Sequence, residues 1–353
     1  MGKNSEYNRN LREKTLAKLH DLEQNLPRYA VVYLDDRELS CQPNTALGYA
    51  YDIRTFFNYL KENNPLCKKY EIKDIPETIL EQLSFEDINE YQKYLACSTT
   101  GTKHLNSESG IARRMAALRG MFQYCCLHGY FRNNPVLGAS KRTKVKTHEI
   151  VRMNAQEVTR LVSSVQTTNL VSPKQRKFCQ KTQLRDTAII TLLLNTGIRV
   201  SECVGLDMGD INFNDKSMGI VRKGGNTQRI YFSDEVADAL HNYIDNERNS
   251  CYDESIEAKA VFLSSQKRRM CVKSVENVVR KYALEAVPDK HITVHKCRST
   301  YGSALYQETG DIYLVAHVLG HKDINTTQKN YSAMEEQHSR KAASVDLYNK
   351  NQK

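Results

Sequence analysis

The chain has 353 residues, which favours two compact units, and its 40% hydrophobic content argues against wholesale disorder. Lys and Arg outnumber Asp and Glu by 51 to 41, and this net charge of +10 suits a polyanion such as nucleic acid. The N-terminus is polar and the longest apolar stretch, 188–194, is too short to span a bilayer, so we expect no membrane residence. The ten cysteines contain no C-x-x-C pair, which predicts reduced thiols in a cytoplasmic protein and no metal site.

The first half of the sequence has the apolar period of helices. One helix follows Thr45 and closes at Asn63-Asn64-Pro65. Ser84 and Asp87 form a capping-box pattern ahead of a second apolar stripe. A third stripe ends at Gly129 and consists of Ile111, Met115, Leu118 and Phe122. These patterns predict an all-helical N-terminal domain.

Basic residues accompany and follow the third stripe. Between its apolar positions lie Arg113, Arg114 and Arg119. These arginines form either an ordinary solvated face or a face that contacts DNA phosphates. The segment from Gly138 to Thr147 is basic and has no apolar period, which predicts a linker between domains. Its Lys141, Arg142 and Lys144 join the candidate DNA contacts. We therefore expect one domain at 1–137, a linker at 138–152 and a second domain at 153–353.

The second half mixes helices with a small amount of strand. Asn154 and Glu157 form another capping box, and an apolar helix at 187–194 ends at Asn195-Thr196-Gly197. The β-rich runs 217–221 and 228–232 flank a turn signal at 223–226, which predicts a hairpin. The remainder is mostly helical, with one short extended piece at 261–263. The predicted fold class is mainly α, with a small antiparallel β-sheet in the C-terminal domain.

Polar clusters with the potential for chemistry are confined to the second half. They are Gly197 to Glu202, Arg222-Lys223-Gly224, His295-Lys296-Cys297-Arg298, Leu319-Gly320-His321, and Tyr331. In this order and spacing they resemble the motif boxes of the tyrosine recombinases, the superfamily of lambda integrase, Xer and Cre. The helical half is similar to that family's core-binding domain, so the resemblance covers roughly residues 45 to 340. A motif such as H-x-x-R occurs by chance about once in such a chain, and only the ordered set is specific.

The residue types suit phosphodiester transfer, in which charge builds on the non-bridging phosphate oxygens. Arg199 and Arg298 fit this task because a guanidinium stays charged and can bind two oxygens. His295 and His321 add hydrogen bonds there or take up the proton of the nucleophile. A ring of cations favours phenolate over phenol, which would activate Tyr331 without a metal.

Two further roles are implied by the resemblance. The proton donor to the leaving 5′ oxygen is Lys223 on the hairpin turn, and Lys216 at the start of the first strand is its nearest rival. Glu202, one helical turn after Arg199, matches an acidic residue that orients the active-site His and Arg.

The implied activity is that of a site-specific DNA recombinase that works through a 3′-phosphotyrosyl intermediate. It would serve integration or excision of a mobile element, or resolution of replicon dimers. No cofactor is implied. The implied partners are double-stranded DNA recombination sites and other copies of the chain, as a homotetramer on DNA and a dimer or monomer when free. The need for a directionality factor or a partner recombinase stays open. Residues 335–347 resemble a tail that docks onto a neighbouring protomer, or form a plain surface helix.

Three other functions compete with this interpretation. His317 and His321 have a spacing used by zinc sites, although Gly320 should end the helix between them. A DNA-binding regulator without catalysis would share the fold but not the chemistry. A type IB topoisomerase would share the phosphotyrosine chemistry and relax DNA without site preference. The target DNA sequence is not readable from the chain.

Overall fold

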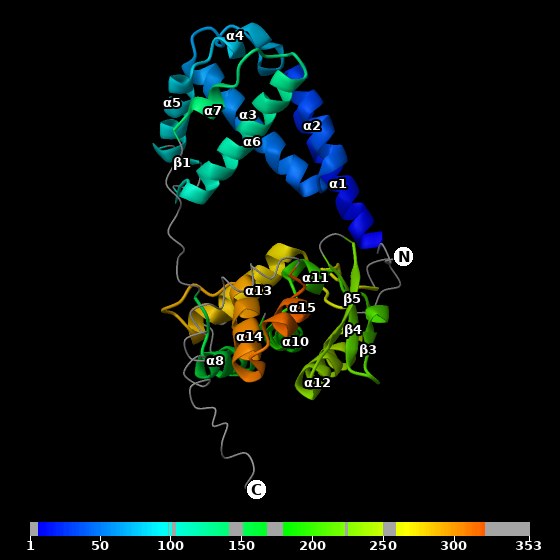
Figure 1. The fold of residues 1–353 in the computed structure, drawn as a ribbon. Helices are drawn as coiled ribbons and strands as arrows, with labels where there is room; N and C mark the ends of the chain where they lie inside the picture. Colours follow the sequence, from blue (N-terminus) through cyan, green and yellow to red (C-terminus); the bar gives the residue numbers. More distant parts are fainter. Residues whose placement is uncertain are drawn as a thin grey trace, which may run out of the picture. The chain divides into compact units, whose positions relative to one another are not determined.

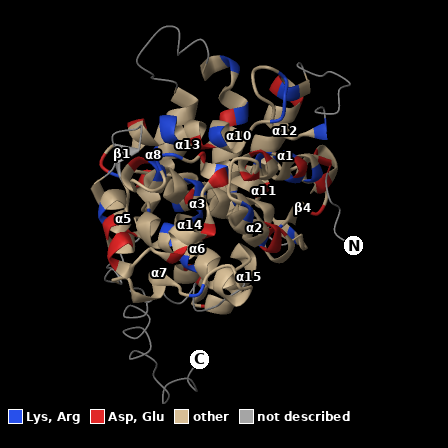
Figure 2. Cartoon of the chain, turned by 90° about the horizontal axis from the view of Figure 1, so that it is seen from above, with Lys and Arg blue, Asp and Glu red and all other residues tan. Residues whose placement is uncertain are grey.

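The computed structural model describes residues 6–97, 99–100, 104–140, 151–167, 179–222, 225–249 and 259–321. The chain divides into two compact units, Glu6–His148 and a second that begins at Glu149 (Figure 1). The division falls inside the segment 138–152 that the sequence predicts as a linker. Lys and Arg, like Asp and Glu, are spread over the helices of both units (Figure 2).

The first unit packs its helices around one aromatic-rich core. Phe56 and Phe57 on the third helix are fully buried, and the ring of Phe56 meets those of Tyr91 at 5.1 Å and Phe122 at 6.3 Å between centroids. The expected end of this helix near Asn63 is confirmed. The helices are α1 (Glu6–Glu23), α2 (Arg28–Ser40), α3 (Pro43–Asn63), α4 (Glu77–Glu81), α5 (Phe85–Cys97), α6 (Glu108–Leu127) and α7 (Pro135–Gly138).

Local signals in this unit act as the sequence predicts. The main-chain N–H of Ser84 donates to the Asp87 carboxylate at 2.8 Å, and that of Asp87 donates to Ser84 Oγ at 3.4 Å, which starts α5. The third apolar stripe is buried along α6. Gly129 follows the end of α6 with a φ of +78°, a left-handed conformation that favours glycine.

The expectation of an entirely helical first domain is wrong in one detail. Strand β1 (Thr99–Thr100) pairs with β2 (His104–Leu105) in an antiparallel arrangement between α5 and α6. Two consecutive threonines are β-branched, and such residues favour extended backbone over helix. The region before Thr45 forms α1 and α2, whose Leu19 and Leu34 are fully buried in the common core.

The second unit is built around one central helix. Helix α10 (Gln183–Thr196) contacts α8, α12, α13 and α14, so it is buried nearly all round, which explains its apolar run. The flanking helices are α8 (Ala155–Thr167), α11 (Val200–Val204), α12 (Asp234–Tyr243), α13 (Val272–Ala286), α14 (Val294–Thr309) and α15 (Ile312–Leu319). The capping box that starts α8 is confirmed, since Asn154 and Glu157 exchange main-chain N–H bonds of 2.8 and 2.9 Å.

The predicted hairpin is the main part of a three-stranded antiparallel sheet. Its strands are β3 (Ile211–Asn212), β4 (Ser217–Val221) and β5 (Thr227–Tyr231), in that spatial order (Figure 1). Ser217 lies opposite Tyr231 and Val221 opposite Thr227. The extended piece expected at 261–263 belongs to no strand. Its Leu263 forms an isolated antiparallel bridge with Arg269, and the preceding Ala260 forms one with Asp207. Within the described ranges, no helix is both long and apolar enough to cross a membrane.

Candidate active site

The first predicted arginine is fixed where α10 turns into α11. Gly197 caps α10 with a φ of +60°, and Arg199 follows as the N-cap of α11. The main-chain N–H of Arg199 donates to Glu202 Oε2 and its Nη1 to Glu202 Oε1, both at 2.8 Å. The Glu202 side chain is buried, whereas 31% of the Arg199 side chain is exposed. Glu202 thus holds a guanidinium that remains partly accessible from solvent.

The second predicted arginine joins three elements of the unit. Arg298 lies on α14, whose N-cap Thr293 accepts from the main-chain N–H of Lys296. Only 3% of Arg298 is exposed. Its Nη1 donates to the carbonyl oxygen of Gly197 at 2.6 Å, and its Nη2 donates to that of Leu319 at the end of α15. Arg298 therefore ties the end of α10 to the end of α15.

The two predicted histidines are held neutral. Burial, followed by the positive charges of Arg298 and Arg199, lowers the pKa of His321 to about 4. The pKa of His295 is lowered by the same causes in the same order. Because these interactions require proximity, the structure brings Arg199, Arg298 and both histidines into one cationic site. A neutral imidazole can donate and accept one hydrogen bond each.

The site contains two residues to which the sequence assigned no role, Arg222 of the cluster Arg222-Lys223-Gly224 and Gln228. Arg222 is 8% exposed, and its Nη1 donates to Glu202 Oε2 at 2.9 Å. Its Nε donates to Gln228 Oε1 at 2.8 Å, and Gln228 Nε2 donates to the carbonyl of His317 at 2.9 Å. A readable signal existed: the period of two along β4 places residue 222 on the buried face that Met218 and Ile220 occupy.

Side chains from the hairpin, from α14 and from the start of α11 cap the C-terminal end of α15. The last carbonyls of a helix lack partners within it and form the negative end of its dipole, which favours cations. Four successive carbonyls accept here: His317 from Gln228, Val318 from Arg222 at 2.6 Å, Leu319 from Arg298, and Gly320 from Arg199 at 3.2 Å. The turn that carries His321 is thereby fixed by the arginines of the site.

Lys223 and Tyr331 lie outside the described residues. The rival Lys216 pairs with Asp234 at the base of the hairpin. At about 3.3 Å per residue, it lies roughly 20 Å along the strand from Arg222.

The candidate DNA contacts of the first unit differ in their surroundings. Arg113 Nη2 donates to Asp52 Oδ1 at 2.8 Å, and Arg114 Nε lies 3.7 Å from the same buried carboxylate. Arg114 also donates to Asn106, and its side chain is only 16% exposed. Arg119 is half-buried on α6. Three of the predicted contacts, Lys141, Arg142 and Lys144, lie outside the described residues.

The competing zinc site finds little support in the described geometry. Helix α15 ends at Leu319, and Gly320 caps it with a φ of +62°, as the sequence predicts. His317 and His321 are therefore separated by a helix end. In the part of the chain that the structure describes, no group of three His, Cys, Asp or Glu side chains is placed to hold a metal ion.

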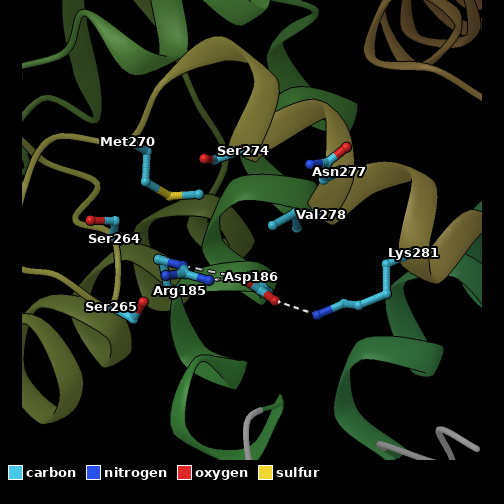
Figure 3. A pocket seen from close by; sticks show the side chains of 9 residues that line it. All are labelled: Arg185, Asp186, Ser264, Ser265, Met270, Ser274, Asn277, Val278 and Lys281. Carbon is cyan, nitrogen blue, oxygen red and sulfur yellow. Dashed lines mark hydrogen bonds and ion pairs between the residues drawn. The ribbon is translucent and has the colours of Figure 1, made fainter. Parts of the chain in front are cut away.

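A separate pocket of about 290 Å³ lies between α10, α13 and the segment around Ser264 (Figure 3). At its base the fully buried Asp186 accepts from Arg185 at 2.7 Å, Lys281 at 2.9 Å and Tyr282 Oη at 3.1 Å. None of the five motif clusters contributes to its lining. These bonds satisfy a buried carboxylate and join α10 to α13, which is a structural role.

Comparison with known proteins places the chain in a family. The model of the phage integrase family matches residues 151–338. The tyrosine recombinase XerS of Streptococcus agalactiae serotype III is 28% identical over 348 residues, which covers 90% of this chain and 94% of the relative. The tyrosine recombinase XerC of Caldanaerobacter subterraneus subsp. tengcongensis is 27% identical over 291 residues, which covers 81% and 77%.

Solved structures of other proteins share the fold of this chain. The Tn1549 transposon integrase in complex with transposon right end DNA superposes with a TM-score of 0.62 at 18% identity, covering 89% of this chain and 99% of that one. The XerH site-specific recombinase in a post-cleavage complex with palindromic difH substrate gives 0.59 at 19%, covering 86% and 79%. The class of protein is that of the tyrosine-type site-specific recombinases. The chain belongs to the phage integrase family.

Proposed function

We propose that this chain cleaves and rejoins double-stranded DNA at specific sites, with Tyr331 as the covalent nucleophile. The observation that carries the proposal is the convergence of Arg199, Arg298, His295 and His321, in which burial and then the charges of the two arginines lower the pKa of both histidines. Such a site places charged guanidiniums and neutral imidazoles together, as phosphoryl transfer requires. The same groups would favour phenolate at an incoming tyrosine.

The proposed reaction is a relay of two transesterifications. The Tyr331 oxygen gives its proton to a histidine of the site and attacks the phosphorus, the 5′ oxygen leaves with a proton from Lys223, and a 3′-phosphotyrosyl bond forms. The 5′-hydroxyl of a second strand then attacks that phosphorus and returns a proton to Lys223, and Tyr331 leaves and regains its proton from the histidine. Arg199 and Arg298 stabilise the pentacovalent phosphate in both steps, while His295 and His321 bind its oxygens or relay the proton. The balance needs neither ATP nor a metal ion.

DNA binding would use both units. The net charge of +10 favours a polyanionic partner, and the XerH and Tn1549 proteins of like fold were solved with DNA. We assign the core-binding role to residues 1–137, the linker to 138–152 and catalysis to 153–353. Arg113, Arg114, Arg119, Lys141, Arg142 and Lys144 are the proposed phosphate contacts.

The proposed assembly on DNA is a homotetramer in the cytoplasm, in which residues 335–347 dock onto a neighbouring protomer. The biological role would be integration or excision of a mobile element, or resolution of replicon dimers. Reconstitution from the purified chain alone tests whether a directionality factor or a partner recombinase is also needed.

Plasmid assays separate this function from its rivals. A duplex selected from a random library for binding is cloned twice in direct repeat, and purified protein is added in chelator. A recombinase excises the segment between the two sites and leaves a plasmid without sites unchanged. Relaxation of the site-free plasmid would instead indicate a topoisomerase, and binding without any strand cleavage would indicate a regulator.

A further inference from the structure

Arg222 contacts three separate parts of the candidate site, and the family resemblance assigns it no role. We propose that Arg222 is a positioning residue that holds the hairpin, the Glu202–Arg199 pair and the turn carrying His321 in one arrangement. The inference rests on the proposed recombinase chemistry, since it concerns the geometry of that site. Arg222 acts through these groups rather than on the DNA itself.

The hydrogen bonds of Arg222 reach three separate elements. Its three nitrogens donate to Gln228 on β5, to Glu202 on α11 and to the carbonyl of Val318 on α15, at 2.8, 2.9 and 2.6 Å. A planar guanidinium has this fork geometry, which a lysine ammonium lacks. Because Nε, Nη1 and Nη2 of Arg222 all donate to groups of the protein, we assign Arg222 to positioning rather than to phosphate binding.

Packing against Gly320 adds a second constraint on the same turn. Gly320 adopts a φ of +62°, and a Cβ at this position would lie 2.7 Å from Arg222 Nε and 2.9 Å from its Cζ. The backbone that leads into His321 therefore lies directly on the guanidinium. A shift of Arg222 removes both the Val318 hydrogen bond and the surface against which this turn packs.

Charge balance gives Arg222 a further effect on Arg199. Glu202 accepts from Arg199 on Oε1 and from Arg222 on Oε2, so two positive charges share one buried carboxylate. Without Arg222, Arg199 and Glu202 would form a neutral pair. With it, the cluster keeps one net positive charge next to the partly exposed Arg199, where a phosphate would bind.

The test uses Arg222→Lys, which keeps the charge and loses the fork. Wild type and variant are compared in single-turnover cleavage of a nicked duplex at saturating protein, and DNA affinity is measured separately. We expect affinity within about twofold and a cleavage rate lower by roughly 10- to 100-fold, the cost of a displacement near 1 Å at the reacting groups. Cleavage at the wild-type rate would overturn the inference.

The matched control is Arg248→Lys. Arg248 is another buried arginine of the second unit, 4% exposed, whose Nε and Nη2 donate to the carbonyl of Ala260 at 3.0 and 2.9 Å. We expect it to lower thermal stability without slowing cleavage at 25 °C. Equal losses of rate in both variants would mean that Arg222 serves stability alone.

A second variant and a second readout keep the test independent of folding and of activity. Gln228→Leu, at a half-buried surface position, removes one partner of Arg222 and should slow cleavage about three- to tenfold; no effect would count against the inference. NMR titration of ring-labelled histidines should show the His321 signal displaced in Arg222→Lys, and an unchanged signal would contradict it. If the wild type forms no adduct, the proposed function fails, while the NMR comparison still decides the role of Arg222.

Discussion

Arg298 donates from Nη1 to the carbonyl oxygen of Gly197 at 2.6 Å, which links α14 to the turn that precedes Arg199. The two predicted phosphate-binding arginines, 99 positions apart in sequence, are thus held by one short turn. This relationship explains why residues from distant motifs act as a unit, and it yields the first prediction.

Arg298→Lys should abolish most of the cleavage while leaving DNA affinity largely intact. A lysine cannot reach Gly197 and Leu319 together and still present two donors to a phosphate. We expect a cleavage rate lower by about 100- to 1000-fold, the range for loss of one transition-state donor, measured in single turnover. Lys296→Arg is the control on the same helix, since Lys296 bonds the carbonyl of His291. Wild-type rates in Arg298→Lys would contradict the proposed role.

The stability of the protein should fall on acidification in a way that depends on His321. Its folded pKa is about 4, below the ordinary value of 6.5, so the unfolded chain binds the proton more readily. Stability is therefore lost as the pH falls from about 6.5 towards 4, by on the order of 1–2 kcal/mol after allowing for solvent screening. Urea unfolding at pH 7.5, 6.0 and 5.0 should show a shallower loss in His321→Gln than in the wild type. Asn277→Gln, at an exposed position of the same unit, removes no titratable group and should not change the slope.

Glu202→Gln should destabilise the second unit by about 2–3 kcal/mol. The variant leaves Arg199 and Arg222 without their shared counter-charge, and breaking a fully buried pair costs about 3–5 kcal/mol. The smaller figure applies because Arg199 is partly exposed. Denaturant unfolding measures the change, and Glu276→Gln, which breaks an exposed pair with Lys273, should cost less than about 0.5 kcal/mol. Equal effects of the two variants would refute the account of Glu202.

Gly320→Ala should damage both stability and cleavage. The left-handed conformation alone costs an L-residue about 1–2 kcal/mol. The added Cβ would also meet the Arg222 guanidinium at 2.7 Å, so we expect a larger total loss and a cleavage rate lower by roughly 100-fold. Gly129→Ala isolates the backbone term, because Gly129 has a φ of +78° and no atom within 4 Å of its Cβ position. Indistinguishable losses in the two variants would argue against close packing at Gly320.

DNA affinity should depend steeply on salt, and the arginines of α6 should divide into two kinds. Six to ten phosphate contacts would lower affinity by about 10³ to 10⁵ between 50 and 200 mM salt. Arg119→Gln should reduce the slope of log affinity against log salt by about one. Arg114→Gln should lower stability in addition to the slope, because Arg114 lies against the buried Asp52 and bonds Asn106. An unchanged slope in Arg119→Gln would remove that residue from the interface.

The sequence predicts those element ends and turns that depend on neighbouring residues. Capping boxes at Ser84 and Asn154, the glycines at 129, 197 and 320, and the hairpin at 217–232 are readable because each depends on a few neighbouring residues. The site arginines were identified through the order of motifs rather than through geometry. The pair β1–β2 was missed because two-residue strands leave almost no period.

Long-range partnerships were beyond sequence reasoning. Nothing in the sequence near Arg222 indicates that Glu202 and Val318 would be its partners, since these contacts are set only when the hairpin packs on α11 and α15. Likewise, Arg113 and Arg114 could be read as a solvated or a phosphate-binding face, because Asp52 lies about 60 positions away in sequence. Buried ion pairs of this kind become visible only with the fold.

Covalent capture decides whether Tyr331 is the nucleophile. A selected binding site, nicked near the cleavage position so that the released strand diffuses away, is incubated with protein in chelator and run on a denaturing gel. Wild type and the control Tyr313→Phe, at an exposed position of α15, should give a protein–DNA adduct whose peptide mass maps to Tyr331, and Tyr331→Phe should give none. An adduct that persists in Tyr331→Phe, or specific binding with no adduct in the wild type, would contradict this account.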